Sequence, residues 1–179
     1  PATRLPGGDV VSATLDLGAE RLRRRALAIA GEVPDPEIPV LTIADLGVLR
    51  GARAREDGSV EVDITPTYSG CPAMNAIALH VETTLAEAGI PARVRLVLSP
   101  AWTTDWMSES GREKLRAYGI APPAPRAARR ALFGMDETVA CPRCGSADTE
   151  KLSEFGSTAC KALWRCTACR EPFDYFKCL

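Results

Sequence analysis

Two cysteine pairs near the C-terminal end constrain the fold of this chain more than any other feature. They occupy residues 141–144 and 166–169, each with the pattern Cys-x-x-Cys. Each pair forms a tight turn whose two sulfurs share one ion, and two such turns supply four thiolates in a tetrahedron, which suits structural Zn²⁺. The gap between the pairs is slightly longer than usual, and a hairpin absorbs it. The predicted zinc ligands are Cys141, Cys144, Cys166 and Cys169.

Other uses of these thiols remain open. The four cysteines alternatively form two disulfides, or they hold iron, which four thiolates also suit. The segment is too small to bury a core of its own, so we expect metal binding to supply its folding energy. Cys160 and Cys178 are left over, either as small buried residues or as a second thiol site.

The residues around the two pairs resemble a known family. Residues 153–161 (SEFGSTACK) lie between the pairs, and residues 171–178 (EPFDYFKC) follow them. Together they resemble the C-terminal zinc ribbon of the PaaD-type accessory subunits of phenylacetyl-CoA ring epoxidase. The resemblance extends from Cys141 to the end of the chain.

Composition narrows the class of protein. The 179 residues allow one moderate domain plus a small module. No apolar run is long enough for a membrane span, and the N-terminal residues lack the apolar core of a signal peptide. Six of the seven cysteines crowd the last quarter without a secretory context, so we expect a cytoplasmic protein. A net charge of −1 argues against nucleic acid as a partner.

Hydrophobic periodicity before the cysteine pairs predicts an α+β fold. We expect helices over residues 16–32, 72–88 and 108–118, and strands over 48–55, 60–64 and 93–98, with one helical turn at 41–46. This order, α-β-β-α-β-α, predicts helices packed on a small three-stranded sheet, followed by a C-terminal zinc ribbon. The predicted units are a domain over 12–120, a linker over 121–137 and the ribbon over 138–179. The arginine run 21–25 is expected to form a solvated helix face, with a partner-docking face as the alternative.

Cys71 is the only cysteine before the ribbon. It stands directly before Pro72, at a predicted helix N-terminus, where the helix dipole and free amides favour a thiolate. We therefore predict a lowered pKa and high reactivity for Cys71. The alternative is a buried structural cysteine, which is common.

The same region carries a second resemblance. Residues 35–37 (DPE), 43–48 (IADLGV), Thr65-Pro66 and Gly70-Cys71-Pro72 resemble the iron–sulfur carrier family that includes SufT, over about residues 21–118. The resemblance implies that Cys71 handles a metal or cluster. Asp35, Glu37, Asp45 and Thr65 are its candidate supporting residues. The alternative role of Asp35 is turn formation and helix capping.

Taken together, the two resemblances imply a non-catalytic accessory protein of the phenylacetyl-CoA epoxidase system. It would deliver metal or iron–sulfur clusters, with structural Zn²⁺ in the ribbon and a transient iron or cluster on Cys71. The implied partners are the oxygenase subunits or their iron–sulfur reductase, and self-association is open. One alternative is a zinc-ribbon adaptor without metal transfer. Another is a thiol enzyme that uses Cys71, although the sequence offers no matching base. Trp106 is expected to pack, and Trp102 either packs or anchors a partner.

Overall fold

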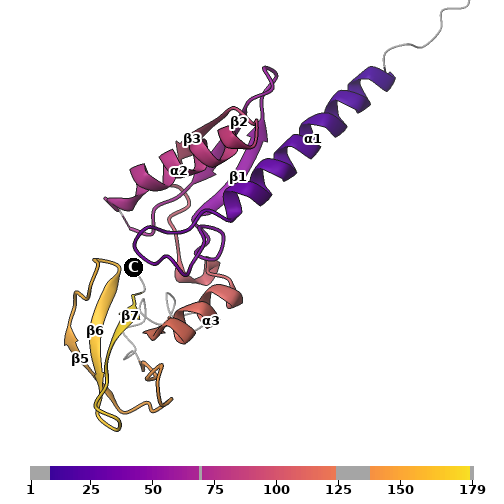
Figure 1. Ribbon diagram of the computed structural model, residues 1–179. Coiled ribbons are helices and arrows are strands. Elements are labelled where there is room, and N and C mark those ends of the chain that lie inside the picture. The colour runs from indigo at the N-terminus through magenta and orange to yellow at the C-terminus, as the bar shows by residue number, and fades with distance from the viewer. Residues whose placement is uncertain (1–8, 69, 124–137, 178–179) are drawn as a thin grey trace, which may run out of the picture.

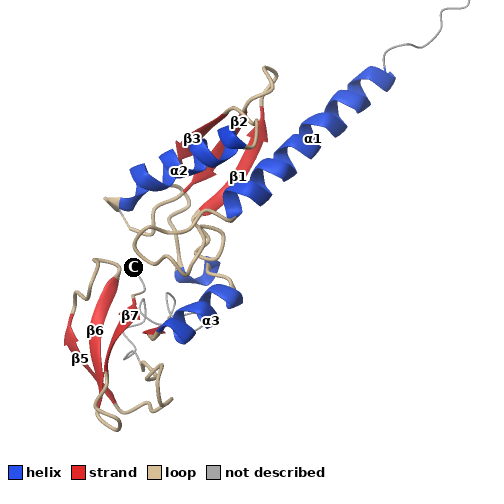
Figure 2. Ribbon diagram, viewed as in Figure 1, coloured by secondary structure: helices blue, strands red, loops and turns tan. Residues whose placement is uncertain are grey.

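The computed structural model describes residues 9–68, 70–123 and 138–177, with the backbone alone for residues 9–16 (Figure 1). The predicted α+β fold is confirmed: helices cover a three-stranded sheet, and a β-ribbon follows (Figure 2). The elements of the N-terminal domain are α1 (Asp9–Gly31), β1 (Leu49–Ala54), β2 (Val60–Ile64), α2 (Ala73–Glu87), β3 (Ala92–Leu96), the short 3₁₀ helix η1 (Thr104–Trp106) and α3 (Glu109–Tyr118).

The sheet has the order β1-β2-β3. A hairpin makes β1 antiparallel to β2, whereas α2 crosses over between β2 and β3 and makes them parallel. The alternation in β2 buries Val60, Val62 and Ile64 beneath the helices. Asp63 lies on the opposite face, where Arg53 and Arg95 each donate to it at 2.7 Å. One face of the sheet is therefore core, and the other is a charged surface.

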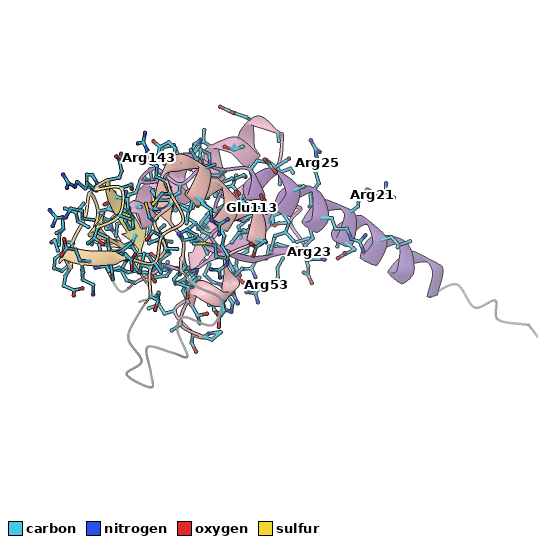
Figure 3. All side chains as sticks on the ribbon, turned by 90° about the horizontal axis from the view of Figure 1, so that it is seen from below. Arg21, Arg23, Arg25, Arg53, Glu113 and Arg143 are labelled. Carbon is cyan, nitrogen blue, oxygen red and sulfur yellow. The ribbon has the colours of Figure 1, made fainter. Side chains whose placement is uncertain are left out.

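The first helix is longer than its apolar pattern predicts, because α1 begins at Asp9 rather than near Asp16. Ala26 and Ala30, in its last turns, are fully buried. Figure 3 shows Arg21 and Arg25 standing away from the helix, and Arg25 donates to the carbonyl of Ala88 at the end of α2, at 2.9 Å. The arginine run is thus mostly solvated, with Arg25 tying α1 to α2.

The segment between α1 and β1, residues 34–47, is here called the acidic loop. The helical turn predicted at 41–46 is present as one α-type turn: the Leu46 amide donates to the Thr42 carbonyl at 3.1 Å, and Gly47, with φ of 69°, ends it. Asp35 Oδ1 accepts from the amides of Glu37 and Ile38, both at 2.8 Å. The loop also buries Ile38, Leu41 and Ile43. It is therefore a packed part of the core, fixed in shape by the Asp35 carboxylate.

The ribbon, residues 138–177, contains β5 (Thr149–Ser153), β6 (Lys161–Cys166) and β7 (Pro172–Phe176). Its sheet has the order β4-β7-β6-β5, and β4 (Ile120–Ala121) pairs in parallel with β7. Ala121, the first residue of the predicted linker, is instead part of this sheet. Residues 124–137 of the predicted linker lie outside the described residues. One strand of the ribbon's sheet thus comes from the N-terminal domain.

The two parts share a hydrophobic core. The larger core cluster belongs to the N-terminal domain but includes Cys160 and Phe176 of the ribbon. The Phe176 ring stands edge-on to Trp102, with centroids 6.1 Å apart, and Trp102 Nε1 donates to the Leu46 carbonyl at 2.9 Å. Trp102 is 5% exposed, so it packs at the junction instead of anchoring an external partner.

Trp106 is half-buried beside the acidic loop, with the Arg50 guanidinium 3.4 Å from the centre of its ring. A Cβ atom at Gly47 would lie 2.6 Å from the Trp106 carbonyl oxygen, so glycine is required for this contact. Among the described helices, none has the length and apolar character needed to cross a membrane.

Candidate metal centre and the junction cavity

The structure brings the four cysteines of the two Cys-x-x-Cys pairs together, with all four sulfurs within 4.8 Å of one another. The Sγ atoms of Cys141 and Cys169 are 3.8 Å apart, and those of Cys144 and Cys166 are 3.6 Å apart. Four sulfurs at about 2.3 Å from a tetrahedral ion lie about 3.8 Å from each other. A disulfide requires about 2.05 Å. The geometry therefore fits a shared metal ion and not two disulfides.

Two matching turns produce this arrangement. In the first, the Gly145 amide donates to the Cys141 carbonyl at 2.9 Å; in the second, the Cys169 amide donates to the Cys166 sulfur at 3.4 Å. The residue after each pair has a left-handed backbone, with φ of 77° at Gly145 and 66° at Arg170. Each turn therefore aims two sulfurs inward from a short stretch of sequence, which is why spacing alone could predict the cluster.

The protonation of these thiols is uneven. The amide of Cys169 stabilises the Cys166 thiolate and lowers the pKa of Cys166 to about 7. The Ser146 amide favours the Cys144 thiolate, but the facing sulfurs of Cys166 and Cys169 outweigh it and raise the pKa of Cys144 to about 12. Few of these crowded thiols can be deprotonated at the same time unless a cation, such as a metal ion, lies between them.

A second feature lies where the two parts meet. A cavity of about 10 Å³, here called the junction cavity, is lined by Asp35, Glu37, Cys71, Cys160, Phe176 and several apolar side chains. This volume is about that of one water-sized sphere. Its polar lining comes from the acidic loop, the loop before α2 and the ribbon loop before β6. The candidate thiol and two of the predicted carboxylates therefore face one small space.

Cys71 is half-buried in this cavity, two residues before the first residue of α2. The predicted lowering of its pKa is wrong. Burial raises the pKa of Cys71; the Ala73 amide at the helix start opposes this, and the charges of Glu37 and Asp35 raise it further. The sequence pattern places Cys71 at the helix start correctly, but the carboxylates that oppose a thiolate come from a segment over thirty positions earlier.

The two acidic residues of the DPE motif differ in role. Asp35 shapes the acidic loop, which agrees with its alternative role in turn formation, although it also lines the cavity. Burial raises the pKa of Asp35 in spite of its two amide donors and the nearby Lys161 charge. Glu37 points across the junction, where the Cys160 thiol donates to Glu37 Oε2 at 3.6 Å. Glu37 is thus the carboxylate that meets a thiol of the ribbon.

Asp45 does not line the junction cavity. It accepts from Lys114 Nζ at 2.6 Å, from the Ser108 hydroxyl at 3.1 Å and from the Thr42 amide at 3.1 Å, and so joins the acidic loop to α3. Thr65 is also outside this cavity. It is 1% exposed, lines a neighbouring hollow, and its hydroxyl has no hydrogen-bond partner among the described residues.

Sequence reasoning misses the meeting of Cys160 with Glu37. The sequence offers Cys160 only as a buried residue or as part of a second thiol site, and no local pattern links it to a residue 123 positions away. Tyr68 is missed as well: burial raises its pKa, and the charges of Cys71, Glu37 and Cys160 raise it further, so it stands among them. Cys178 lies outside the described residues.

Two family models match the chain. Residues 24–97 match the model described as an iron-sulfur cluster assembly protein, and residues 125–177 match the PaaD zinc beta ribbon domain. The first model covers the acidic loop and Cys71, and the second covers all four clustered cysteines together with Cys160.

Individual relatives match the chain over one or both of these parts. An Escherichia coli (strain K12) protein, named as a putative subunit of 1,2-phenylacetyl-CoA epoxidase, is 52% identical over 153 residues, which are 85% of this chain and 90% of that protein. The "Fe-S protein maturation auxiliary factor SufT" of Staphylococcus aureus is 40% identical over 80 residues, 42% of this chain and 88% of the relative. The crystal structure of a DUF59 domain from Bacillus anthracis superposes with a TM-score of 0.52 at 25% identity, and covers 56% of this chain and 96% of that one.

Proposed function

The chain belongs to the PaaD family, and from that premise we propose that it serves a phenylacetyl-CoA epoxidase as a non-catalytic accessory protein. Its task is the delivery of iron, as an ion or within a cluster, to the oxygenase or to its iron–sulfur reductase. The N-terminal domain carries the cargo, and the ribbon supplies structure and a docking surface. The relatives named as iron–sulfur protein maturation factors support the delivery of iron. The relative named as an epoxidase subunit supports the link to that enzyme.

The observation that carries this proposal is the position of Cys71. Its half-buried thiol lines a small cavity together with Glu37 and a second thiol, Cys160, so a thiol and a carboxylate border the space beside it. A direct thiol enzyme has less support, because a raised pKa leaves Cys71 a poor nucleophile at neutral pH. His80, the only histidine of the chain, is exposed on α2 and does not line the cavity.

We further propose that the ion held by Cys141, Cys144, Cys166 and Cys169 is Zn²⁺. The sulfur spacing and the all-thiolate donor set suit it, and the match to a zinc ribbon model supports it. Zn²⁺ would supply four bonds that hold the two turns together. The chain itself positions the sulfurs through the Gly145 and Cys169 amides.

The decisive experiment examines the oxygenase and not this protein. Oxygenase subunits are purified from cells that lack this chain, then analysed for iron and assayed for ring epoxidation. We expect folded oxygenase with little iron, whose activity returns when the protein and an iron source are added together. The Cys71→Ser variant should restore little activity, because cargo transfer needs the thiol.

A zinc-ribbon adaptor is the second candidate, and the pairing of β4 with β7 favours it, since it fixes the ribbon as a rigid docking element. The same experiment separates the two candidates. Full iron occupancy in an inactive oxygenase, with activity restored equally by Cys71→Ser, would support the adaptor. Strong turnover in the complete absence of the protein would refute both.

A further inference from the structure

β3 forms one edge of the sheet of the N-terminal domain, and part of that edge is unpaired (Figure 1). The Val97 amide donates inward to the Ile64 carbonyl of β2 at 2.8 Å. Successive amides of a strand point to opposite sides, so those of Val94 and Leu96 point outward. Glu82 of α2 accepts from the Val94 amide at 2.8 Å, whereas the Leu96 amide has no partner among the described residues. The edge is therefore capped at Val94 and open from Leu96 onward.

Exposed leucines lie along the open part of this edge. Leu96 and Leu98, on β3 and just after it, are 51% and 65% exposed. Leu79 is 66% exposed and lies one helical turn before Glu82, on the same side of α2. Since α2 crosses over between two parallel strands, it runs opposite to β3, and a turn back from Glu82 leads toward Leu96. The three leucines, here called the leucine edge, thus lie on one flank of the domain.

The leucine edge continues into a hollow of about 360 Å³. Leu98 lines this hollow together with Pro66, Tyr68, Ala101 and Trp102, so its walls are mostly apolar. Trp102 is buried and fixed by its hydrogen bond to the Leu46 carbonyl, which makes that wall rigid. A pocket of this kind beside exposed apolar side chains suits one large apolar side chain of a partner, as in the centre of protein interfaces.

The opposite face of the sheet gives the same edge a positive charge. It presents four arginines but only two carboxylates, namely Arg53, Arg55, Arg93, Arg95, Glu61 and Asp63. The two carboxylates are bound by the other three arginines. Arg93, on β3 itself, has no carboxylate partner within the part of the chain that the structure describes. A segment with negative charge is therefore favoured beside this strand.

We propose that this edge is a docking site, at which an extended, acidic segment of a partner protein adds a strand to β3. The backbone of the segment pairs with the open amide of Leu96. Because side chains alternate along a strand, its apolar residues cover the leucine edge and enter the hollow, while its Asp or Glu residues face Arg93 and Arg95. The site rests on the proposed function, in which the partner is a subunit of the epoxidase system, and it adds a contact on the N-terminal domain to the one on the ribbon.

A second copy of this chain fits the edge less well. If β3 paired antiparallel with β3 of another copy, Arg93 and Arg95 would face the arginines of that copy. Like charges directly opposite one another on neighbouring strands are unfavourable. The arginines therefore discourage self-pairing at an open edge and select a segment of opposite charge.

The test uses the full, zinc-loaded chain and the separately purified subunits of the oxygenase and its reductase, with binding measured by calorimetry. We expect one subunit to bind, with an affinity that falls as salt is added. Leu96→Asp places a charge in the apolar half of the site and should weaken binding by about tenfold or more. Arg93→Glu should also weaken binding and should reduce its dependence on salt. Leu96→Pro removes the outward amide and should weaken binding more than Leu96→Ala, which keeps it.

Leu17→Asp and Arg21→Glu are the matched controls, because both residues are exposed on α1, away from β3. They should leave the affinity unchanged. Denaturant unfolding verifies that each variant is folded, and Arg93→Glu stays decisive if a Leu96 variant is not.

Three outcomes would overturn the docking site: no subunit binds, binding survives both Leu96→Asp and Arg93→Glu, or the chain self-associates through an edge that Leu96→Pro blocks. Binding that every variant keeps, with oxygenase iron still dependent on this chain, would refute the site and leave the delivery function standing. Binding that the edge variants lose, with an oxygenase that acquires iron without this chain, would confirm the site and refute the delivery function.

Discussion

At the scale of single residues, the two turns of the ribbon differ in one informative position. Gly145 and Arg170 each follow a Cys-x-x-Cys pair and each has a positive φ, yet only one is glycine. A side chain in the left-handed region costs about 1–2 kcal/mol, whereas glycine adopts it freely. The second turn therefore carries backbone strain that the first does not.

We expect Gly145→Ala to lower the free energy of unfolding of the zinc-loaded protein by about 1 kcal/mol. A Cβ at this position meets no atom within 4 Å, so the cost is one of backbone conformation alone. Arg170→Gly is the reciprocal variant and should raise the free energy, as measured by denaturant unfolding. Equal effects of the same sign in the two variants would contradict this account.

A second residue-scale prediction concerns pH and Asp45. Burial alone would raise its pKa, but Lys114, the Thr42 amide and the Ser108 hydroxyl outweigh burial and hold the pKa of Asp45 below its ordinary value. A depressed carboxyl pKa stabilises the fold above the unfolded-state value, about 4, and this contribution disappears as the pH falls further. Asp45→Asn should therefore cost about 2 kcal/mol at pH 7 and less at pH 3, where part of this contribution is already lost.

The control for this prediction is Glu154→Gln. Glu154 pairs with Lys151 at 2.9 Å, but its side chain is 65% exposed. Exposed pairs contribute little, so this variant should leave the free energy of unfolding nearly unchanged at either pH. An Asp45→Asn protein whose stability loss is the same at pH 3 and pH 7 would exclude the ion pair as the cause.

At the residue scale, features set by neighbouring residues are predictable from the sequence, and features set by tertiary contacts are not. The four clustered cysteines are predictable because two tight turns place them, and each turn is local. The pKa of Cys71 is predicted with the wrong sign, because the helix start is local whereas Glu37 and burial depend on the tertiary fold. The role of Cys160 depends on the docking of two units, which no spacing within either unit encodes.

At the scale of elements, the order of helices and strands follows from periodicity, and the errors fall at ends and junctions. The helix over 108–118 is well predicted because Ser108 caps its start and Gly119 ends it with φ of 90°. β4 is missed because two residues carry no periodicity and the strand exists only through its pairing with β7. Local signals thus specify elements, while junctions depend on partners far along the chain.

The contact between the loop before η1 and β7 supports an element-scale prediction. Trp102→Ala should lower the free energy of unfolding by about 3–5 kcal/mol, since it removes a buried ring and the hydrogen bond to Leu46. A double-mutant cycle with Phe176→Ala should give a coupling of about 1 kcal/mol, as expected for an edge-to-face pair.

Trp106 provides the matched control for this cycle. Its ring lies against the Arg50 guanidinium, whereas the edge-to-face pair with Phe176 belongs to Trp102. A Trp106→Ala and Phe176→Ala cycle should give a coupling near zero, within about 0.5 kcal/mol. Equal coupling for both tryptophans would mean that Phe176 acts through general core loosening and not through its contact with Trp102.

At the scale of the whole molecule, the two units form one structure. Cys160 and Phe176 complete the core of the N-terminal domain, while Ile120 and Ala121 complete the sheet of the ribbon. We expect folding of the ribbon to depend in turn on the metal that its four cysteines would hold. On this expectation the four-cysteine site and the junction cavity are coupled through the fold, although they share no residue.

This coupling predicts that removal of the ribbon's metal exposes Cys71. After treatment with a strong chelator, alkylation of Cys71, followed by peptide mass mapping, should accelerate severalfold, because the ribbon no longer closes the cavity. Readdition of zinc before the alkylating agent should restore slow labelling and serves as the control. Unchanged labelling of Cys71 after demonstrated metal loss would show that the N-terminal domain closes the cavity unaided.

The junction cavity is lined by residues of both the N-terminal domain and the ribbon, and this has a consequence during synthesis of the protein. Cys160 follows Cys71 by 89 residues, so at about 5–20 residues per second the ribosome adds the ribbon's part of the lining roughly 4–18 s after Cys71. Domains fold from the N-terminal end as they emerge. For those seconds Cys71 faces the cell without the ribbon, and a metal ion or an oxidant reaches it directly.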